Sequence, residues 1–496
     1  MKTSFSVHNR TERKCDDVMK KIKALDIKKL DTKKMVMYGG VAVGAGVTGV
    51  YGAKQVVRKA VHMAQNSVMR VVMSDLYDEN IYEVISATKR VGVQESIETG
   101  LRATEGKAIS RPMGSPKPFP DLGNIMFNIA QLYTMPTPFE QEIDMKVVIG
   151  KKARKPLEID MPILLAPMAY GVALSKKAKV ALAKGASLAN TATYSGEGPV
   201  LKEEREVASK YIYQYHRGDW GKTEANLTNC DAIEIQFGQG AIAGVGHVFD
   251  AKYMDHEMRE AYGYPTGKSI VAHSRQPEVQ HPSQLPHLVE RLREISGGVP
   301  IGAKIGAGKY LEADLDILCS SGVDFIALDG AQAATKGSPP ILQDDFGVPT
   351  VFAISRAAEW LYKNNYQNAV TLLAGGKIRT PGDMLKACGL GADACYIGAI
   401  ALFAMSNMQV LKVLPFEPPT QLVWYHAKGD KKLNVEEGAE SLKKFLIACK
   451  EEIGEGIKGL GKTRLREVNT EDLMAMDEMI SKGCNIPMVY EPFEGV

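Results

Sequence analysis

Short apolar runs alternate with amphipathic segments along the last two thirds of the chain. Each run holds four or five residues, and most gaps between the runs carry a helical spacing of apolar positions. This alternation is typical of βα units that build a parallel sheet. The eight runs are 162–166, 187–191, 211–215, 232–236, 300–304, 325–329, 370–373 and 394–397.

Eight βα units in this length of chain predict a closed (β/α)8 barrel, the TIM barrel fold. The clearest predicted helices between the runs are 174–184, 311–320, 354–364 and 381–390. The main alternative is an open, doubly wound sheet. In that fold the glycine-rich, phosphate-binding turn follows the first strand, whereas the glycine turns of this chain follow the last two runs. We therefore expect an α/β protein whose barrel has a helical N-terminal extension and a helical C-terminal tail.

Two glycine turns follow the seventh and eighth runs, at Ala374–Lys377 and Tyr396–Ala399. Glycine lets a backbone approach a ligand closely, and the N–H groups at a helix start attract an anion. In TIM barrels the loops after these two strands commonly hold a phosphate. The turns could also be ordinary strand-to-helix connections, but the count of eight runs favours a phosphorylated cofactor or substrate.

The N-terminal third has a different composition. Residues 10–34 are rich in lysine, and the nineteen residues 35–53 carry no charge, so they could just cross a bilayer as a helix. Six of the nineteen are glycine and none is Leu, Ile or Phe, so a buried or surface-lying helix is an equal alternative. The predicted division is a basic segment with this helix (1–60), a helical and Pro-rich region (61–144), the barrel (145–428) and a helical tail (429–496).

The net charge and the spacing of the cysteines indicate which partners, metals and cellular setting to expect. The net charge is +3 with dispersed lysines, so no nucleic-acid partner is expected. The seven cysteines show no CxxC pair and no metal-ligand spacing, so we expect no metal site and a reduced, cytoplasmic setting, with membrane association only through the N-terminal segment. Cys388 and Cys395 are expected to pack within the last βα unit.

Several motifs resemble the FMN-binding synthase domain of glutamate synthases, in particular its short single-domain members. The resemblance covers roughly residues 145–465, and the common order and spacing of the motifs make it specific. The motifs are 150–157, Met168–Gly171, Gly196–Gly198, Ile233–Ala241, Gly302–Lys304, Leu328–Gly330, Ala374–Asp383 and Leu390–Asp393.

The resemblance implies an FMN-dependent oxidoreductase acting on CH–NH2 donors. Members of the family reduce 2-iminoglutarate, made from 2-oxoglutarate and ammonia, to glutamate. The FMN phosphate would lie in the two glycine turns, with the isoalloxazine ring against 166–168. The implied cofactor contacts are Ala166, Pro167, Met168, Ala169, Thr193, Gln236, Lys304, Asp329, Gly330, Gly375, Gly376, Lys377, Gly398 and Ala399.

Three residues are the implied catalytic groups. Lys304 would lie near the N1/O2 edge of the flavin, where a cation stabilises the reduced form. The alternative role for Lys304 is a salt bridge at the barrel rim. Glu197 would face the substrate as an acid or an orienting group, or else be a solvated loop carboxylate. Gln239 would contact polar atoms of the flavin or the substrate.

The chain departs from the family after the fourth and sixth runs. Where the family has QGAKPGEGG, this chain has Gln239–His247, with Ile242 and Val245 in place of a lysine and a glutamate. In the family these polar groups help to bind a dicarboxylate, so the resemblance does not extend to 2-oxoglutarate as substrate. After the sixth run Lys336 adds a charge that could bind a substrate anion or face water.

The largest departure follows the eighth run. The family carries three cysteines there that hold an iron–sulfur cluster, whereas this chain has no cysteine between Cys395 and Cys449. Because such clusters need thiolate ligands, we expect none, and electrons would reach the flavin directly from a nicotinamide or a partner protein. The chain also lacks the catalytic cysteine directly after Met1 that a glutaminase domain would have. Ammonia or an amine would therefore come from solution or from a partner.

Two further functional classes remain. One is an FMN barrel of another chemistry, such as a hydroxy-acid dehydrogenase, which would need a histidine base near the end of the sixth or seventh run; no histidine lies there. The other is a non-catalytic barrel that serves as a scaffold. A long insert over 245–295, which includes His273 and His281, is expected to cover the barrel mouth. A small acid substrate and a homo-oligomer complete the expected partners.

Overall fold

The computed structural model describes residues 42–77, 79–80, 82–415 and 418–492, with the side chains of 42–54 and 418–419 excepted. The chain divides into two units, Met1–Thr104 and Glu105–Val496. The expectations for residues 1–41, which include the lysine-rich segment and the first part of 35–53, lie outside the described residues.

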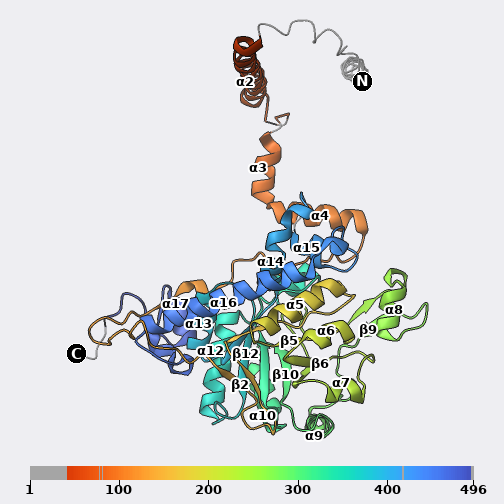
Figure 1. Ribbon diagram of the computed structural model, residues 1–496, viewed down its shortest axis with the longest axis vertical. Helices are drawn as coiled ribbons and strands as arrows, with labels where there is room; N and C mark the ends of the chain where they lie inside the picture. Colours follow the sequence, from red (N-terminus) through yellow and green to blue (C-terminus); the bar gives the residue numbers. More distant parts are fainter. Residues whose placement is uncertain (1–41, 78, 81, 416–417, 493–496) are drawn as a thin grey trace, which may run out of the picture. The chain divides into compact units, whose positions relative to one another are not determined.

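The described part of the N-terminal unit is helical, as expected from the sequence. Its described helices are α2 (Ala42–Ser74), α3 (Tyr82–Val91) and α4 (Val93–Glu105) (Figure 1). Helix α2 continues past residue 60, where the sequence placed a boundary. Over the part of the chain that the structure describes, no helix combines the length and the apolar character that crossing a membrane requires.

The second unit contains the predicted barrel of eight parallel strands (Figure 1). The order around the barrel is β4-β13-β12-β11-β10-β7-β6-β5, and the barrel closes between the two ends of this order, where the amide of Leu165 donates to Ala192 O at 3.1 Å. The strands are β4 (Ile163–Leu165), β5 (Thr193–Tyr194), β6 (Tyr211–Tyr215), β7 (Ala232–Gln236), β10 (Ile301–Gly306), β11 (Phe325–Asp329), β12 (Thr371–Gly375) and β13 (Ala394–Ile397).

Helices surround the strands of the barrel. Helix α10 buries Leu311, Leu315 and Leu318 at the spacing of one helical face, and Thr380 caps α13 in a capping box with Asp383. The helices are α5 (Lys176–Leu188), α6 (Lys202–Val207), α7 (Glu224–Thr228), α9 (Leu285–Ile295), α10 (Leu311–Ser320), α11 (Pro340–Asp344), α12 (Thr350–Lys363), α13 (Pro381–Gly389), α14 (Ala399–Ser406) and α15 (Pro418–Val423).

The second strand is not where the apolar run predicted it. Residues 187–191 were expected to form a strand, but α5 continues to Leu188, and β5 begins at Thr193. The helix continues because its small residues pack against a second helix: a Cβ on Gly185 would lie 2.8 Å from a methyl group of Leu442. Asn190, with a φ of +56°, then turns the chain into the short strand.

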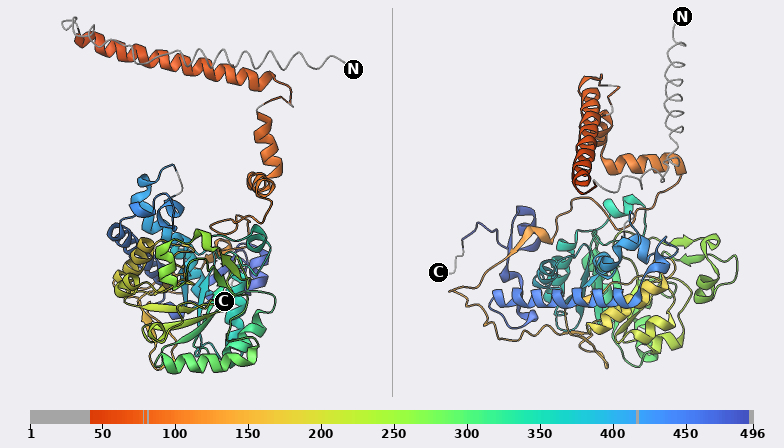
Figure 2. Two further views of the ribbon diagram at one scale, coloured as in Figure 1. Left: turned by 90° about the vertical axis from the view of Figure 1, so that its right-hand side faces the viewer. Right: turned by 45° about the horizontal axis from the view of Figure 1, so that its top comes forward.

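Segments from both ends of the second unit wrap the barrel (Figure 2). Strand β1 (Ile125–Phe127) of the proline-rich region pairs antiparallel with β14 (Leu473–Ala475) of the C-terminal tail. Strands β2 (Val147–Ile149) and β3 (Leu157–Ile159) form a hairpin before the barrel. The long helix α16 (Val435–Gly459) packs along α5, and α17 (Glu478–Cys484) packs against α12.

The insert after β7 lies against loops of the barrel mouth. It contains β8 (His247–Phe249), α8 (His256–Tyr262) and β9 (Ile270–Ala272), whereas α9 at its end belongs to the barrel. The hydroxyl of Tyr262 donates to Tyr170 O at 3.0 Å, and Trp220 packs against the ring of Tyr262. The insert therefore covers the part of the mouth formed by the loops after β4 and β6.

Candidate active site at the carboxyl ends of the strands

Glu197, Gln236 and Gln239 form one polar cluster at the mouth. The amide nitrogen Nε2 of Gln236, at the end of β7, donates to Glu197 Oε1 and, at 3.3 Å, to Gln239 Oε1. Glu197 lies in the loop after β5, and its side chain is only 13% exposed. The structure thus brings together two of the three predicted catalytic residues and one predicted cofactor contact.

Two residues that were not predicted as site residues, Arg217 and His247, flank Glu197. The guanidinium of Arg217 lies 4.0 Å from Glu197 Oε1, and His247 Nε2 lies 3.8 Å from Oε2. Arg217 is fully buried, which lowers its pKa, although Glu197 opposes this effect. Arg217 follows β6 without a recognisable motif, and His247, the first residue of β8, ends the segment Gln239–His247, which the sequence singled out only for Ile242 and Val245.

Arg217 also holds the loop that carries Gln239. Its Nη1 donates to Gly244 O at 2.7 Å, and its Nη2 to Val245 O at 3.4 Å. Loop 237–246 is strained, because Ala241 and Ala243 have φ values of +64° and +51°, a region that alanine rarely adopts. The buried arginine therefore stabilises an uncommon backbone conformation next to the cluster.

Lys304, the third predicted catalytic residue, lies inside the barrel. Its ammonium donates to Asp329 Oδ1 at 3.1 Å and lies 4.1 Å from the centre of the Tyr396 ring. Asp329 also accepts from the hydroxyl of Tyr396 and from the amide of Gly240 at 3.0 Å. The ion pair that the sequence kept as an alternative is present, and it ties β10, β11 and β13 together at the base of the mouth.

A buried carboxylic acid lies next to this pair. Glu234 of β7 is inaccessible to solvent, and burial raises its pKa, while Lys304 opposes the rise. Gln214 Nε2 donates to Glu234 Oε1 at 2.8 Å. The hydroxyl of Tyr194 interacts with the Glu234 carboxyl group, whereas Gln236 Oε1 is buried without a hydrogen-bond partner among the described residues. An unpaired buried oxygen at a barrel mouth indicates a site for a polar ligand or ordered water.

The two turns need glycine for different reasons. A Cβ on Gly375 would meet the ring of Tyr396, and one on Gly376, whose φ is +128°, would meet Thr350 Oγ1. These two glycines are needed for packing and backbone conformation. At Gly398 the nearest atom to an added Cβ is Ala166 Cβ at 3.5 Å, so the space above this turn is open.

Gly398 begins helix α14, which no described side chain caps. The first N–H groups of a helix have no acceptor within the helix and point toward an anion. Ala166, Pro167 and Met168, after the neighbouring strand β4, are only half-buried. An open space, uncapped donors and a partly exposed apolar segment fit a phosphate next to a flat aromatic ring, so these residues fit the expected FMN.

A buried lysine organises the loops on this side of the mouth. The ammonium of Lys179 donates to Met168 O at 2.7 Å, to Tyr194 O at 2.8 Å and to Ser195 O at 3.0 Å. It thereby joins the loop after β4 to the loop that leads to Glu197. Gly196 is fitted closely into this arrangement, since a Cβ there would lie 2.5 Å from the carbonyl carbon of Met168.

The other predicted contacts lie nearby with partners of their own. Lys377 Nζ pairs with Asp121 Oδ2 at 2.9 Å. Lys336 Nζ donates to Val172 O at 2.8 Å, and burial lowers its pKa, so it does not simply face water. Thr193 and Gly330 are buried, and the amide of Gly330 donates to Gly375 O at 2.9 Å. Ala169 is buried.

The six cysteines of the described residues are all buried, and none belongs to the polar cluster around Glu197. Cys388 in α13 and Cys395 in β13 are both buried, and the proximity of Cys388 together with burial raises the pKa of Cys395. They pack in the last βα unit as expected. Among the described residues no group of three or more His, Cys, Asp or Glu side chains has the arrangement of a metal site.

Comparison with known proteins gives a consistent result. The family profile described as "Conserved region in glutamate synthase" matches residues 121–463. A glutamate synthase large subunit-like protein of Rhizobium meliloti is 32% identical over 301 residues, 60% of this chain and 67% of that protein. The archaeal-type glutamate synthase (NADPH) of Thermotoga neapolitana is 27% identical over 383 residues, 73% of this chain and 75% of that protein.

Among solved structures, a mutant flavocytochrome b2 with benzoylformate has a TM-score of 0.47 and 16% identity. The match covers 76% of this chain and 84% of that chain. The assignment of the barrel rests on the strand order of this chain itself.

Proposed function

The chain belongs to the glutamate synthase family, and we propose that it is an FMN-dependent oxidoreductase acting on an amino, imino or related keto acid. The observation that carries the proposal is the cluster of Glu197, Gln236 and Gln239 at the same barrel mouth as the open, uncapped helix start at Gly398. Acid–base groups and an anion site at one barrel mouth are what such a reaction needs.

The chain's own residues would bind the cofactor in two places. The N–H groups at the start of α14 and the backbone after β12 would hold the phosphate, and Ala166–Met168 would lie against the ring. When bound, FMN supplies the hydride acceptor and donor of the reaction. Lys304 and Asp329 would keep fixed charges beneath the site without moving, because both are buried and hydrogen-bonded to each other.

Glu197 is the residue we propose to move a proton. Reduction of an imine adds a hydride to carbon and a proton to nitrogen, and a carboxylic acid at the mouth can supply that proton. Gln236 fixes the orientation of Glu197, while Arg217 and His247 lie on the two sides of its carboxylate. His247 is partly exposed, so it connects Glu197 to solvent for return of the proton.

We propose that electrons reach the flavin without an iron–sulfur cluster in this chain, since the cysteines that would hold one are missing between Cys395 and Cys449. The relative from Thermotoga neapolitana is named for NADPH, which supports a nicotinamide donor. A partner protein is the alternative donor.

A second candidate is an FMN barrel that oxidises a hydroxy acid. The neighbouring His247 and Glu197 favour it, because a histidine beside a carboxylate can act as a general base. His216 is not suited to this role, since burial lowers its pKa to about 3 and its ring stacks on Trp220.

The test is the visible spectrum of the purified protein before and after addition of FMN, followed by anaerobic titration with NADPH and NADH. We expect flavin absorbance that bleaches on reduction. Protein that stays colourless after FMN is added would refute the proposal in favour of a non-catalytic barrel. Bleaching by hydroxy acids in place of nicotinamides would favour the second candidate.

A further inference from the structure

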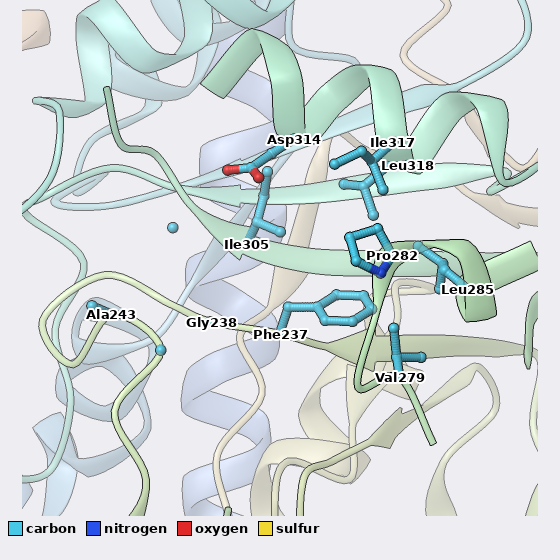
Figure 3. Close-up of a pocket in the computed structure, with 12 residues that line it drawn as sticks. Phe237, Gly238, Ala243, Val279, Pro282, Leu285, Ile305, Asp314, Ile317 and Leu318 are labelled. Atoms are coloured by element: carbon cyan, nitrogen blue, oxygen red, sulfur yellow. The ribbon is translucent and has the colours of Figure 1, made fainter. Parts of the chain in front are cut away.

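A cavity of about 350 Å³ lies outside the barrel wall, between the ends of β7 and β10 and the helices α9 and α10. Figure 3 shows Phe237, Pro282 and Leu285 together at one side of it, with Ile317 and Leu318 above. This volume lies within the usual range for small-molecule sites, and most of the lining side chains are apolar. The cavity is separate from the cluster around Glu197.

One charged side chain, that of Asp314, lines the cavity within the described part of the chain. It lies at the opposite side from Leu285 in Figure 3. Asp314 is an exposed residue, no other described side chain pairs with its carboxylate, and partial desolvation raises its pKa. Asp314 lies in the first turn of α10, where the helix dipole favours an acid. The dipole does not explain why this acid borders an apolar cavity.

The wall of the cavity is continuous with the proposed active site. Gly238, Ala243 and Gly244 line it, and they belong to the strained loop that carries Gln239. Gly306, also in the lining, touches the other side of this loop: a Cβ there would lie 3.1 Å from the backbone of Gln239. A molecule in the cavity would therefore contact the loop directly.

We propose that this cavity binds a small ligand with an apolar body and one positive charge, an amine, and that binding stabilises loop 237–246. The apolar body would fill the space between Phe237, Leu285 and Ile317, and the ammonium would pair with Asp314. An anion would have no partner in the lining. Any effect on turnover rests on the proposed function, but binding itself does not.

Calorimetry with 2-phenylethylamine tests the site, using the full chain without added cofactor. The matched probes 2-phenylethanol and 3-phenylpropionate keep the apolar body and remove or reverse the charge. We expect the amine to bind more tightly than the alcohol, and the acid least. Asp314→Asn should weaken amine binding about fivefold, the size of a partly exposed ion pair, and leave alcohol binding unchanged.

Two variants complete the design. Asp316→Asn removes an exposed acid of the same helix that does not line the cavity, and it should leave binding unchanged. Ile317→Trp should fill the cavity and abolish binding of both the amine and the alcohol. Equal effects of Asp314→Asn and Asp316→Asn, or tighter binding of the acid than of the amine, would overturn the proposal, as would no binding of any probe.

Hydrogen exchange supplies the readout for the loop. The amine should slow hydrogen exchange of the amides in 237–246 in the wild-type chain. At the same amine concentration, exchange in Asp314→Asn should be slowed to a smaller extent. Binding without any change of exchange there would refute the coupling to the loop. If the protein proves to bind no FMN, these measurements still decide whether the cavity is a site.

Discussion

The ammonium of Lys179 lies 2.9 Å from Glu204 Oε1, and the two side chains are 2% and 0% exposed. Burial raises the pKa of Glu204 from 4.5 to about 7, although the charge of Lys179 opposes the rise. The native state therefore holds a proton on Glu204 between these two pH values, whereas the unfolded state does not. Its contribution to stability is complete below about pH 4.5 and is lost as the pH rises through 7.

We predict that Glu204→Gln removes this pH dependence. At pH 5 the variant should have nearly the wild-type free energy of unfolding, because glutamine resembles the protonated acid. At pH 8.5 it should be more stable than the wild type by roughly 3 kcal/mol, the free energy that corresponds to a pKa raised from 4.5 to about 7. Denaturant unfolding at both pH values measures this.

The control is Glu203→Gln, which removes the exposed neighbouring acid that pairs with Lys176. It should change stability by less than about 0.5 kcal/mol at either pH. If Glu204→Gln were instead more damaging at pH 8.5 than at pH 5, the ion pair would outweigh its desolvation and the pKa of Glu204 would lie below its ordinary value.

The second prediction separates the two glycine turns. Gly398→Val should lower FMN affinity at least tenfold and change the free energy of unfolding by about 1 kcal/mol or less, because a side chain there enters open space where the phosphate is expected. Gly376→Val should destabilise the fold by about 1–3 kcal/mol, since it must adopt a φ of +128° and meets Thr350. Flavin titration and denaturant unfolding of each variant measure the two effects.

A matched control is Gly308→Val, which replaces a glycine of the loop after β10 with no atom within 4 Å of an added Cβ. It should bind FMN as the wild type does. Normal FMN affinity in Gly398→Val would show that the phosphate lies elsewhere.

The sequence predicted the strand ends well and the contacts between them poorly. The apolar runs place Gln236, Lys304 and Asp329 at the ends of parallel strands, and this is enough to expect that they converge. The run 187–191 was wrongly predicted as a strand, because α5 continues to Leu188, where the small residues before the run, such as Gly185, pack on α16. Arg217 and His247 were not predicted, because an isolated basic residue has no recognisable pattern until the fold brings it to Glu197.

The third prediction concerns Glu197. Glu197→Gln should keep FMN binding and lower turnover about 100-fold or more, because the amide cannot donate a proton as an acid does. It should also remove the part of the pH–rate profile that depends on this carboxyl group. Glu257→Gln, an exposed acid on α8, is the control and should leave turnover unchanged. A variant of Glu197 with full activity would exclude the role of proton donor.

The fourth prediction is that purified protein with full FMN content contains well below one iron atom per chain. The missing thiolates between Cys395 and Cys449 are the reason. Iron analysis, together with the absence of a broad visible band after the flavin is bleached, measures it. Iron at a fixed, whole-number ratio to the chain would contradict this expectation.

The last prediction concerns the acid substrate. Ile242 is half-buried and Val245 is 48% exposed, where the family has a lysine and a glutamate, and the Arg217 guanidinium nearby already binds the backbone of this loop. A carboxylate without a partner in an apolar site costs several kcal/mol, so a dicarboxylate should bind poorly unless Lys336 provides that partner. The ammonium of Lys336 already donates to Val172 O, which leaves donors for one carboxylate but not for two.

We therefore expect weak or no reoxidation of the reduced enzyme by 2-oxoglutarate with ammonia, and faster reoxidation by smaller or more apolar keto acids with ammonia. Stopped-flow absorbance across such a panel is the measurement. Lys336→Met should slow reoxidation by every acid if this lysine holds the carboxylate next to the reacting carbon, whereas Lys309→Met, an exposed lysine beyond β10, should not. Fast reoxidation by 2-oxoglutarate alone would show that the pocket still binds a dicarboxylate and that the changes at Ile242 and Val245 do not set its specificity.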